Sequence, residues 1–221
     1  MTLRAVMFDH DGTLVDSERI HYEMWVRILA DHGHDLPESQ YKAVYAGMPT
    51  PANAADMVRR FGIAASVDQL IESKNSATQA YLSQRAFPLM PRAREVIVEL
   101  YEAGLKLAVV TGASASGVHV TLRANNLEGY WTTIVSGDDV RRSKPAPDCY
   151  LLALERLGVA PAECLAIEDT QYGVEAAHGA GISSVAVPSD MSSHQDFRHA
   201  SAILGNMSEL GGYLRDRRVR R

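Results

Sequence analysis

A short apolar segment that ends in two closely spaced aspartates constrains this chain more than any other feature. Residues 5–8, Ala-Val-Met-Phe, are apolar throughout, as expected of a strand that is buried on both faces of a parallel sheet. Asp9, His10, Asp11 and Gly12 follow directly. Because ligands bind beyond the carboxyl ends of the strands in an α/β sheet, we expect both carboxylates at a binding site.

Two carboxylates at this spacing repel each other, so they need a cation, a shared proton or different chemical roles. A hard dication such as Mg²⁺ suits oxygen ligands and commonly also binds a substrate phosphate. The structural alternative is a strand that simply ends in an Asp-Gly turn. The position of the motif, directly after an apolar strand, favours the functional interpretation.

Residues 16–87 show the spacing of amphipathic helices and contain no convincing strand. An all-helical stretch between a first strand and the next α/β unit indicates an inserted subdomain. Helices are expected at about 16–33, 37–46, 50–61 and 66–85, the third with Thr50 as N-cap and Pro51 as its first helical residue. The apolar face expected for the fourth helix consists of Leu70, Ile71, Ala77, Tyr81 and Leu82.

From Pro88 onwards helices and strands alternate, which is typical of a parallel sheet with helical crossovers. Strands are expected at 105–111, 132–136, 165–169 and 182–187, with a short edge strand at 202–204. Helices are expected at 91–103, 114–125, 147–157, 171–179 and from about 208. The sequence therefore predicts an α/β fold with an inserted helical subdomain.

The later strands also lead into polar residues. The second ends at Thr111, and Gly112 and a helix start follow, where a hydroxyl and free backbone N–H groups suit a phosphate. Lys144 comes after the third strand. The fourth ends in Glu168 and Asp169, and adjacent buried acids require a cation or hydrogen-bond donors. Taken singly, Thr111 could simply mark the turn after a strand, and Lys144 could be an ordinary exposed lysine.

Together, these segments resemble the four sequence motifs of the haloacid-dehalogenase superfamily, in its phosphatase and phosphomutase branch. Asp-His-Asp-Gly-Thr-Leu at 9–14 resembles the first motif, Thr111 the second and Lys144 the third. Residues 168–181, Glu-Asp-Thr-Gln-Tyr-Gly-Val-Glu-Ala-Ala-His-Gly-Ala-Gly, resemble the fourth. The motifs occur in order, each at the end of a predicted strand.

This resemblance implies a Rossmann-like parallel-sheet core with helices on both faces, formed by residues 1–15 and 88–221. It also implies that residues 16–87 form an all-helical cap inserted after the first motif. The implied activity is that of a phosphoric monoester hydrolase, a Mg²⁺-dependent phosphatase with an aspartyl-phosphate intermediate. Its substrate would be a small phosphorylated metabolite, a sugar or polyol phosphate.

The resemblance assigns roles to the residues that match the motifs. Asp9 would be the nucleophile that attacks phosphorus. Asp11 would be the general acid/base, which protonates the leaving oxygen and then activates water. The hydroxyl of Thr111, the amide of Gly112 and the ammonium of Lys144 would bind the phosphoryl oxygens.

The same resemblance implies a metal site and a cap histidine. Asp9, Asp169 and the backbone carbonyl of Asp11 would hold Mg²⁺, with Glu168 acting through a water molecule or from behind the direct ligands. His21 falls where the mutases of this family place a cap-hinge histidine beside the acid/base. We therefore expect His21 at the substrate, with a surface position on the first cap helix as the alternative.

Two other functions stay open. One is a phosphomutase of the β-phosphoglucomutase type, which needs cap cations to grip the distal phosphate. The stretch Ala46–Thr50 carries neither of the two cations found there in such mutases, although one helical turn could aim Lys42 inward. The other is a catalytically idle protein that binds a phosphate ligand. The complete set of motif residues favours hydrolysis.

Composition bounds the remaining function classes. The formal net charge of −5 argues against a general nucleic-acid binder. No apolar run reaches membrane-spanning length and no signal peptide is visible, so we expect a cytoplasmic protein without membrane or obligate protein partners. Cys149 and Cys164 are expected to be buried thiols. The arginine-rich tail from Arg215 is expected to be frayed and solvated.

Overall fold

The computed structural model describes the backbone of residues 2–219 and the side chains of residues 2–215. Its centre is a six-stranded sheet in the order β3-β2-β1-β4-β5-β6, and every neighbouring pair is parallel. The strands are β1 (Ala5–Phe8), β2 (Lys106–Val110), β3 (Thr133–Val135), β4 (Cys164–Glu168), β5 (Ser183–Ala186) and β6 (Ala202–Ile203). This is the strand order of a Rossmann-like sheet.

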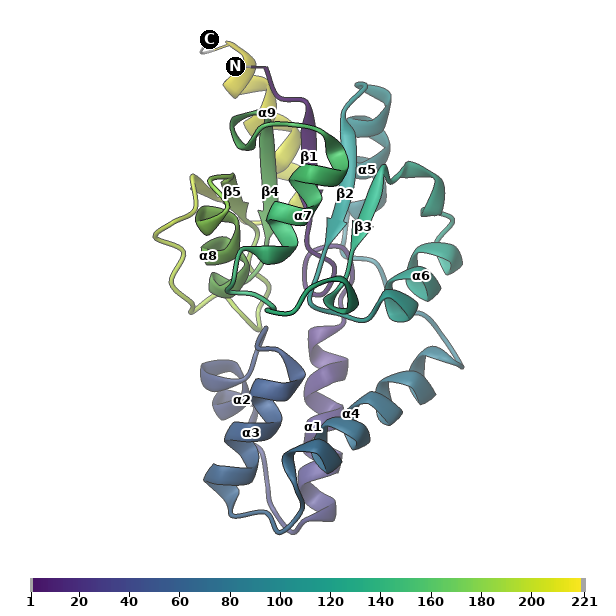
Figure 1. Ribbon diagram of the computed structural model, residues 1–221, viewed down its shortest axis with the longest axis vertical. Coiled ribbons are helices and arrows are strands. Elements are labelled where there is room, and N and C mark those ends of the chain that lie inside the picture. Colours follow the sequence, from purple (N-terminus) through teal and green to yellow (C-terminus); the bar gives the residue numbers. More distant parts are fainter. Residues whose placement is uncertain (1, 220–221) are drawn as a thin grey trace.

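Helices cover both faces of this sheet (Figure 1). One face carries α5 (Ala93–Glu102), α6 (Ala115–Ala124) and α9 (Leu210–Val219), and the other carries α7 (Asp148–Leu157) and α8 (Gln171–Gly179). Successive side chains of a strand point to opposite faces, so Val6 and Phe8 pack in the first layer and Ala5 and Met7 in the second. The predicted α/β fold with helices on both faces is confirmed.

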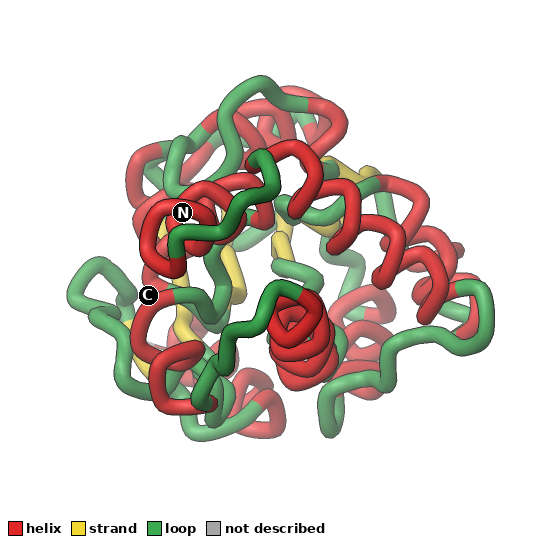
Figure 2. The backbone as a smooth tube through the Cα atoms, turned by 90° about the horizontal axis from the view of Figure 1, so that it is seen from below, coloured by secondary structure: helices red, strands yellow, loops and turns green. Residues whose placement is uncertain are grey.

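The helices of residues 16–87 lie beyond the carboxyl ends of the strands, at the bottom of Figure 1. They are α1 (Glu18–Asp31), α2 (Glu38–Val44), α3 (Thr50–Phe61) and α4 (Val67–Leu82). Figure 2 views the molecule from this end, with helical segments around the short strands. The four helices enclose an apolar cluster of their own, which includes Trp25, Tyr41 and Leu70 and also takes in Met191 from the loop after β5.

Two local predictions are wrong. α3 begins at Thr50 with Pro49 in the N-cap position, because this Pro-Thr-Pro stretch enters the helix one residue earlier than expected. The chain from Arg215 to Val219 continues α9 rather than fraying. Leu210 and Leu214 anchor that helix in the core, and arginine is a good helix former. Residues 220–221 of the tail lie outside the described residues.

None of the helices between residues 2 and 219 combines the length and the apolar character that crossing a bilayer requires.

The strand register determines which side chains meet at the end of the sheet. Phe8 is paired with Val109 of β2 on one side and with Ile167 of β4 on the other. The next residue, Asp9, donates its N–H to the carbonyl of Ile167 at 3.0 Å. Asp9 therefore lies beside Glu168, where the strand order reverses and open α/β sheets bind their ligands.

The first turn of α8 packs directly on the end of β4, and this contact requires glycine. A Cβ atom on Gly173 would lie 2.0 Å from Cδ of Glu168. We predict that Gly173→Ala lowers the free energy of unfolding by about 1–3 kcal/mol, the usual cost of overpacking. Glu168 cannot move aside easily because Lys144 and Tyr150 both hydrogen-bond to its carboxylate.

Gly179→Ala, at the other end of the same helix, is the matched control. A Cβ atom there would meet Pro147 at an ordinary 3.4 Å, and alanine is the better helix residue, so we expect unchanged or slightly higher stability. Urea unfolding of both variants measures the difference. Equal free energies of unfolding would contradict the proposed contact.

Candidate active site

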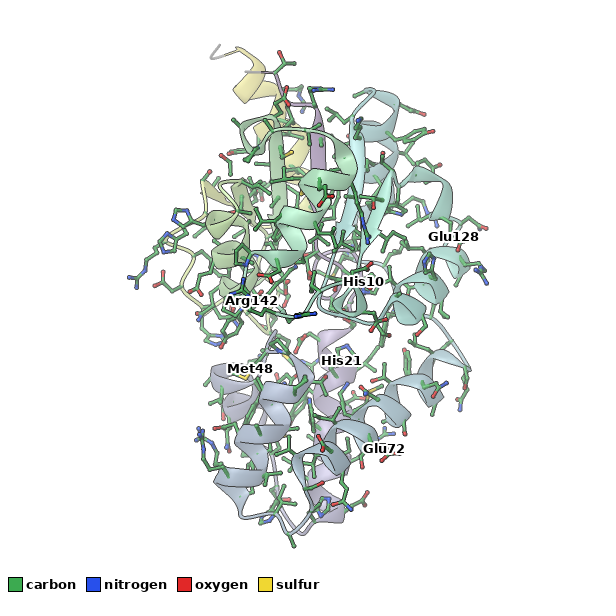
Figure 3. All side chains as sticks on the ribbon, viewed as in Figure 1. His10, His21, Met48, Glu72, Glu128 and Arg142 are labelled. Atoms are coloured by element: carbon green, nitrogen blue, oxygen red, sulfur yellow. The ribbon has the colours of Figure 1, made fainter. Side chains whose placement is uncertain are left out.

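A cavity of about 500 Å³ lies between the cap helices and the carboxyl ends of the strands. In Figure 3, His21 and Met48 lie on the cap side of this junction, and His10 and Arg142 on the core side. All the site residues predicted from the sequence line this cavity except Glu168 and Asp169, which lie beneath it.

Lys144 connects the core residues of the site. Its Nζ atom donates hydrogen bonds to Oδ1 of Asp9 at 2.6 Å, to Oε1 of Glu168 at 2.6 Å and to the carbonyl oxygen of Val110 at 2.8 Å. These contacts use all three donors of the ammonium group. Burial by itself lowers the pKa of Lys144, but the negative charges of Asp9 and Glu168 outweigh burial and raise this pKa above its usual value. The lysine is therefore a permanent buried cation.

Glu168 is fully buried, and a second donor fixes its position. The hydroxyl of Tyr150 on α7 donates to Oε1 of Glu168 at 2.6 Å. Burial raises the pKa of Glu168 to about 7, against the opposing effect of Lys144. The sequence does not signal this role, because Tyr150 lies on an apolar face of α7 with Leu154 and Leu157.

Asp9, Glu168 and Asp169 each offer a carboxylate oxygen, and these oxygens lie within 4.8 Å of one another. Burial, followed by repulsion from Asp9 and Glu168, raises the pKa of Asp169 well above its usual range. Oε2 of Glu168 has no hydrogen-bond partner among the described residues, and Asp169 receives a bond of 3.4 Å from Thr13. A buried set of oxygen ligands that lacks enough positive charge fits a hard dication such as Mg²⁺.

The turn after β1 brings its backbone close to this acidic cluster. Gly12 has a φ angle of +78°, and a Cβ atom there would lie 2.1 Å from Oδ2 of Asp169. Only glycine meets both demands without strain. The Asp-x-Asp-Gly pattern thus places the two halves of the predicted metal site in contact.

The predicted phosphate-binding residues lie on the same cavity. Thr111 is buried at the end of β2, and its Oγ1 accepts a hydrogen bond from the N–H of Ala113 at 3.1 Å. A Cβ atom on Gly112 would lie 2.9 Å from Oγ of Ser143, so a side chain there would displace that hydroxyl. The helix α6 begins just beyond, at Ala115. The cavity is therefore lined here by the hydroxyl of Thr111 and the backbone of Gly112, close to the N-terminus of α6, where a phosphate can bind.

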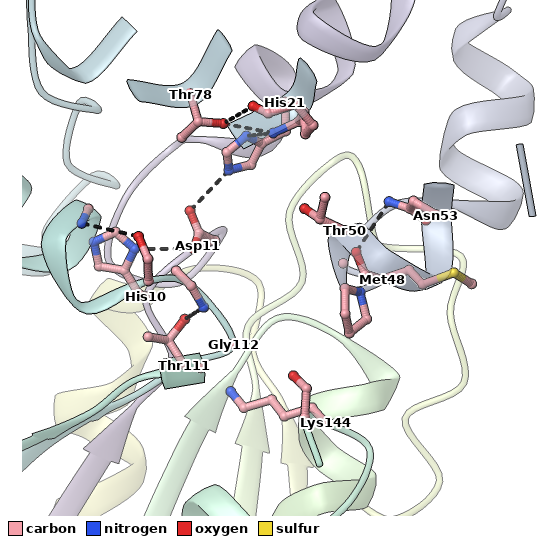
Figure 4. Close-up of a pocket in the computed structure, with 18 of the residues that line it drawn as sticks. His10, Asp11, His21, Met48, Thr50, Asn53, Thr78, Thr111, Gly112 and Lys144 are labelled. Atoms are coloured by element: carbon pink, nitrogen blue, oxygen red, sulfur yellow. Dashed lines mark hydrogen bonds and ion pairs between the residues drawn. The ribbon is translucent and has the colours of Figure 1, made fainter. Parts of the chain in front are cut away.

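Three side chains hold the carboxylate of Asp11, and Figure 4 shows two of them, His10 and His21. Oδ1 accepts a hydrogen bond from Oγ of Ser17 at 2.5 Å and lies 3.4 Å from Nε2 of His21. Oδ2 lies 3.2 Å from Nδ1 of His10. Burial by itself would raise the pKa of Asp11, but His10 and His21 together hold it well below its usual range. Ser17 occupies the N-cap position of α1, but its side chain makes no capping hydrogen bond and contacts Asp11 instead.

A buried cap lysine, missed in the sequence, extends this chain of contacts. Nζ of Lys74 on α4 lies 3.0 Å from Nδ1 of His21 and 3.0 Å from Oγ1 of Thr78. An ammonium group can only donate, so Nδ1 of His21 accepts and Nε2 carries the proton toward Asp11. Burial lowers the pKa of Lys74 to about 8, although Glu18 and Asp11 oppose this shift.

The sequence did contain a signal for Lys74. It lies four residues after Leu70, within the face of α4 that was expected to be apolar, and a lysine there must find polar partners. The structure does not realise the possibility that Lys42 points inward. Lys42 pairs with Asp190 at 2.7 Å and with Glu38 at 2.9 Å, and it does not line the cavity.

The cap also contributes an acid that the sequence analysis did not identify. Oε1 of Glu18 accepts hydrogen bonds from the hydroxyl of Tyr41 at 2.5 Å and from the N–H of Gly47 at 3.3 Å. A Cβ atom on Gly47 would lie 2.2 Å from Cγ2 of Thr170, so the cap loop packs tightly on the start of α8. The cavity thus has an acceptor and a cation on its cap side.

Comparison with known proteins agrees with this geometry. The haloacid dehalogenase-like hydrolase family matches residues 6–187. Protein CbbY from Rhodobacter capsulatus is 30% identical over 216 residues, which cover 94% of this chain and 95% of that protein. A phosphorylated carbohydrates phosphatase from Thermotoga maritima is 31% identical over 183 residues, covering 83% of this chain and 84% of that protein.

A solved structure extends the similarity to three dimensions. The crystal structure of a CbbY variant from Rhodobacter sphaeroides in complex with xylulose-(1,5)bisphosphate matches with a TM-score of 0.82 at 27% identity, and the match covers 95% of this chain and 97% of that one. The family match alone spans all four motifs predicted from the sequence. The chain therefore belongs to the haloacid dehalogenase-like hydrolases, in their phosphatase and phosphomutase branch.

Proposed function

We propose that this protein is a Mg²⁺-dependent phosphatase that hydrolyses a sugar or polyol phosphate through an aspartyl-phosphate intermediate. The observation that carries the proposal is the position of Asp9, which Lys144 binds within an acidic cluster at the base of the cavity between cap and core. The phosphorylated carbohydrates phosphatase among the relatives supports this class of substrate.

The chain's own residues suggest how each step proceeds. Oδ1 of Asp9 is bound by Lys144, so its other oxygen, Oδ2, attacks phosphorus. Asp11 gives a proton to the departing alcohol and then takes one from the water that hydrolyses the intermediate. The hydroxyl of Thr111, the N–H of Gly112 and the ammonium of Lys144 offset charge on the phosphoryl oxygens.

The metal would be held by Asp9, Asp169 and the backbone carbonyl of Asp11, with Glu168 behind them. The position of Glu168 supports this supporting role, since Lys144 and Tyr150 already bind its Oε1. When bound, Mg²⁺ supplies positive charge against the phosphoryl oxygens.

The proposal includes the division of the chain into a core of residues 1–15 and 88–221 and a cap of residues 16–87. An apolar cluster formed by the cap helices, joined by Met191 of the core, supports this division. A cytoplasmic location is proposed as well, and the two free, buried cysteines, Cys149 and Cys164, are compatible with a reducing compartment.

A phosphomutase is the second candidate, and Lys74 is the observation that favours it. This buried cation faces the cavity from the cap, where a mutase would bind the second phosphate of a bisphosphate. The CbbY structure with xylulose-(1,5)bisphosphate shows that a protein of this fold accepts such a ligand. Hydrolysis remains the proposal because Lys74 already donates to His21 and Thr78.

We predict that the protein releases inorganic phosphate catalytically from a panel of sugar, polyol and sugar bisphosphates in the presence of Mg²⁺. Phosphate release is measured for each ester, and metal-stripped protein in excess chelator is the control. Conversion of β-glucose 1-phosphate to glucose 6-phosphate, primed with a bisphosphate, is followed in parallel. Efficient isomerisation without phosphate release would establish the mutase instead.

Asp9→Asn should abolish turnover while the fold stays intact. The amide has nearly the same shape but is a far weaker nucleophile, so we expect a rate loss of several orders of magnitude, about 5 kcal/mol or more of barrier. Single-turnover phosphate release and thermal unfolding are measured side by side. Retention of more than about a tenth of the wild-type rate would refute the nucleophile assignment.

Lys74→Met should lower kcat/KM about 10- to 100-fold, the usual effect of losing a buried charged donor. Because burial lowers the pKa of Lys74 to about 8, its charge is present below that pH and lost above it. Wild-type kcat/KM should therefore fall as the pH rises through about 8, and the variant should lack this step.

Lys42→Met is the matched control, since it removes a cap lysine that pairs with Asp190 on the surface. Exposed ion pairs contribute little, so we expect kcat/KM within about two-fold of wild type. Similar losses in the two variants would show that general cap charge, and not the position of Lys74, determines activity.

A further inference from the structure

The side chain of Tyr150, on α7, is buried beneath the cavity. It is 0% exposed and does not line the cavity, so it does not touch a bound substrate. Its ring belongs to the apolar layer between the sheet and α7, where Ala108 and Val110 of β2 also pack. Burying a hydroxyl in such a layer costs free energy unless the hydroxyl finds a hydrogen-bond partner. The partner that Tyr150 finds therefore indicates its role.

That partner is the carboxylate of Glu168. The hydroxyl of Tyr150 donates to Oε1 at 2.6 Å, and Glu168 is its one hydrogen-bond partner among the described residues. Lys144 donates to the same oxygen at 2.6 Å, so both lone pairs of Oε1 are in use. Oε2 is buried and has no partner within the part of the chain that the structure describes. The two donors thus fix the rotation of the carboxylate and leave Oε2 as its free acceptor.

The two donors to Glu168 differ in what else they contact. The ammonium group of Lys144 also bonds to Asp9 and Val110, so it is shared among three strand ends. The hydroxyl of Tyr150 binds Glu168 from a ring that apolar packing holds in place. Nζ of Lys144 also lies 5.3 Å from the centroid of that ring, within reach of a cation–π interaction. Tyr150 therefore contacts both members of the buried Lys144–Glu168 pair.

We propose that Tyr150 is a positioning residue for the metal site, whose hydroxyl holds Glu168 in the orientation that Mg²⁺ binding requires. This inference rests on the proposed Mg²⁺-dependent function. Asp9, Glu168 and Asp169 offer carboxylate oxygens within 4.8 Å of one another in this orientation. Residues that orient a metal site from behind commonly change metal affinity about 10- to 100-fold when they are replaced. Tyr150 thus acts on metal affinity and has no contact with the substrate.

Tyr150→Phe tests this role, because it removes the hydroxyl and keeps the ring. Mg²⁺ binding to metal-stripped protein is measured by titration calorimetry, and we expect the Kd to rise about 10-fold. The Mg²⁺ concentration that gives half-maximal turnover of a sugar phosphate should rise by a similar factor. At saturating Mg²⁺, kcat and KM should return to within about three-fold of wild type, because uniform binding of the ester is untouched.

Tyr45→Phe is the matched control. Tyr45 is also 0% exposed, and its hydroxyl donates to Oδ2 of Asp56 at 3.0 Å, but neither residue lines the cavity. Each variant therefore removes one hydroxyl that a buried tyrosine donates to a carboxylate. We expect the Mg²⁺ Kd of Tyr45→Phe to equal that of the wild type. Thermal unfolding of both variants records the stability that each substitution removes.

Three results would overturn the positioning role of Tyr150. They are an unchanged Kd in Tyr150→Phe, an equal rise of the Kd in both variants, and a loss of kcat that saturating Mg²⁺ does not restore. Absence of Mg²⁺ binding by the wild type would overturn it as well. Wild-type turnover tests the proposed hydrolysis by itself. Mg²⁺ binding that Tyr150→Phe weakens, in a protein that releases no phosphate, would support the positioning role and refute the phosphatase.

Discussion

The site depends on one buried cation. Lys144 lies in the loop between β3 and α7, yet its ammonium group bonds to the ends of β1, β2 and β4 through Asp9, Val110 and Glu168. A buried ion pair is costly to desolvate, and removing one partner leaves the others uncompensated. These three contacts therefore hold the ends of β1, β2 and β4 together and place one positive charge against the buried carboxylates of Asp9 and Glu168.

This arrangement separates the two aspartates electrostatically, although they are only one residue apart. Asp9 lies among carboxylates, and burial raises its pKa even though Lys144 opposes the shift. Asp11 faces histidines, and its pKa is held well below its usual range. Groups whose surroundings shift their pKa values in opposite directions are suited to different tasks. Asp9, among other carboxylates, therefore calls for a cation nearby, whereas Asp11 is stabilised by hydrogen-bond donors.

The core half of the site could be predicted from the sequence because its residues are tied to strand ends. A parallel sheet places the carboxyl ends of its strands at one edge, so Asp9, Thr111 and Asp169 had to lie close together once the strands were assigned. Lys144 also comes after a strand, β3, but a longer loop separates it from the strand end. The register of β1 and β4 places Asp9 beside Glu168, which is the arrangement that the predicted metal site needs.

The cap half could not be predicted in the same way, because its geometry depends on how helices pack. Lys42 and Lys74 are both lysines on amphipathic helices, and only the rotation of each helix against its neighbours decides which one meets His21. The single clue in the sequence was the position of Lys74, four residues after Leu70 on the face of α4 that was expected to be apolar. Ser17 lies at the N-cap position of α1, yet its hydroxyl binds the carboxylate of Asp11, which the sequence did not indicate.

The contacts of Asp11 link the position of the cap to the chemistry. Two of its donors, Ser17 and His21, are at the start of the cap, and Lys74 in turn holds His21 from α4. Any movement of the cap away from the core would weaken the contacts of Ser17 and His21 with Asp11 together, since both residues belong to the start of α1. His10 belongs to the core turn and would stay, because its backbone is bonded to Leu14 and Val15. Oδ2 of Asp11 is therefore bound from the core turn and Oδ1 from the cap, so Asp11 keeps all three contacts only while the cap is seated on the core.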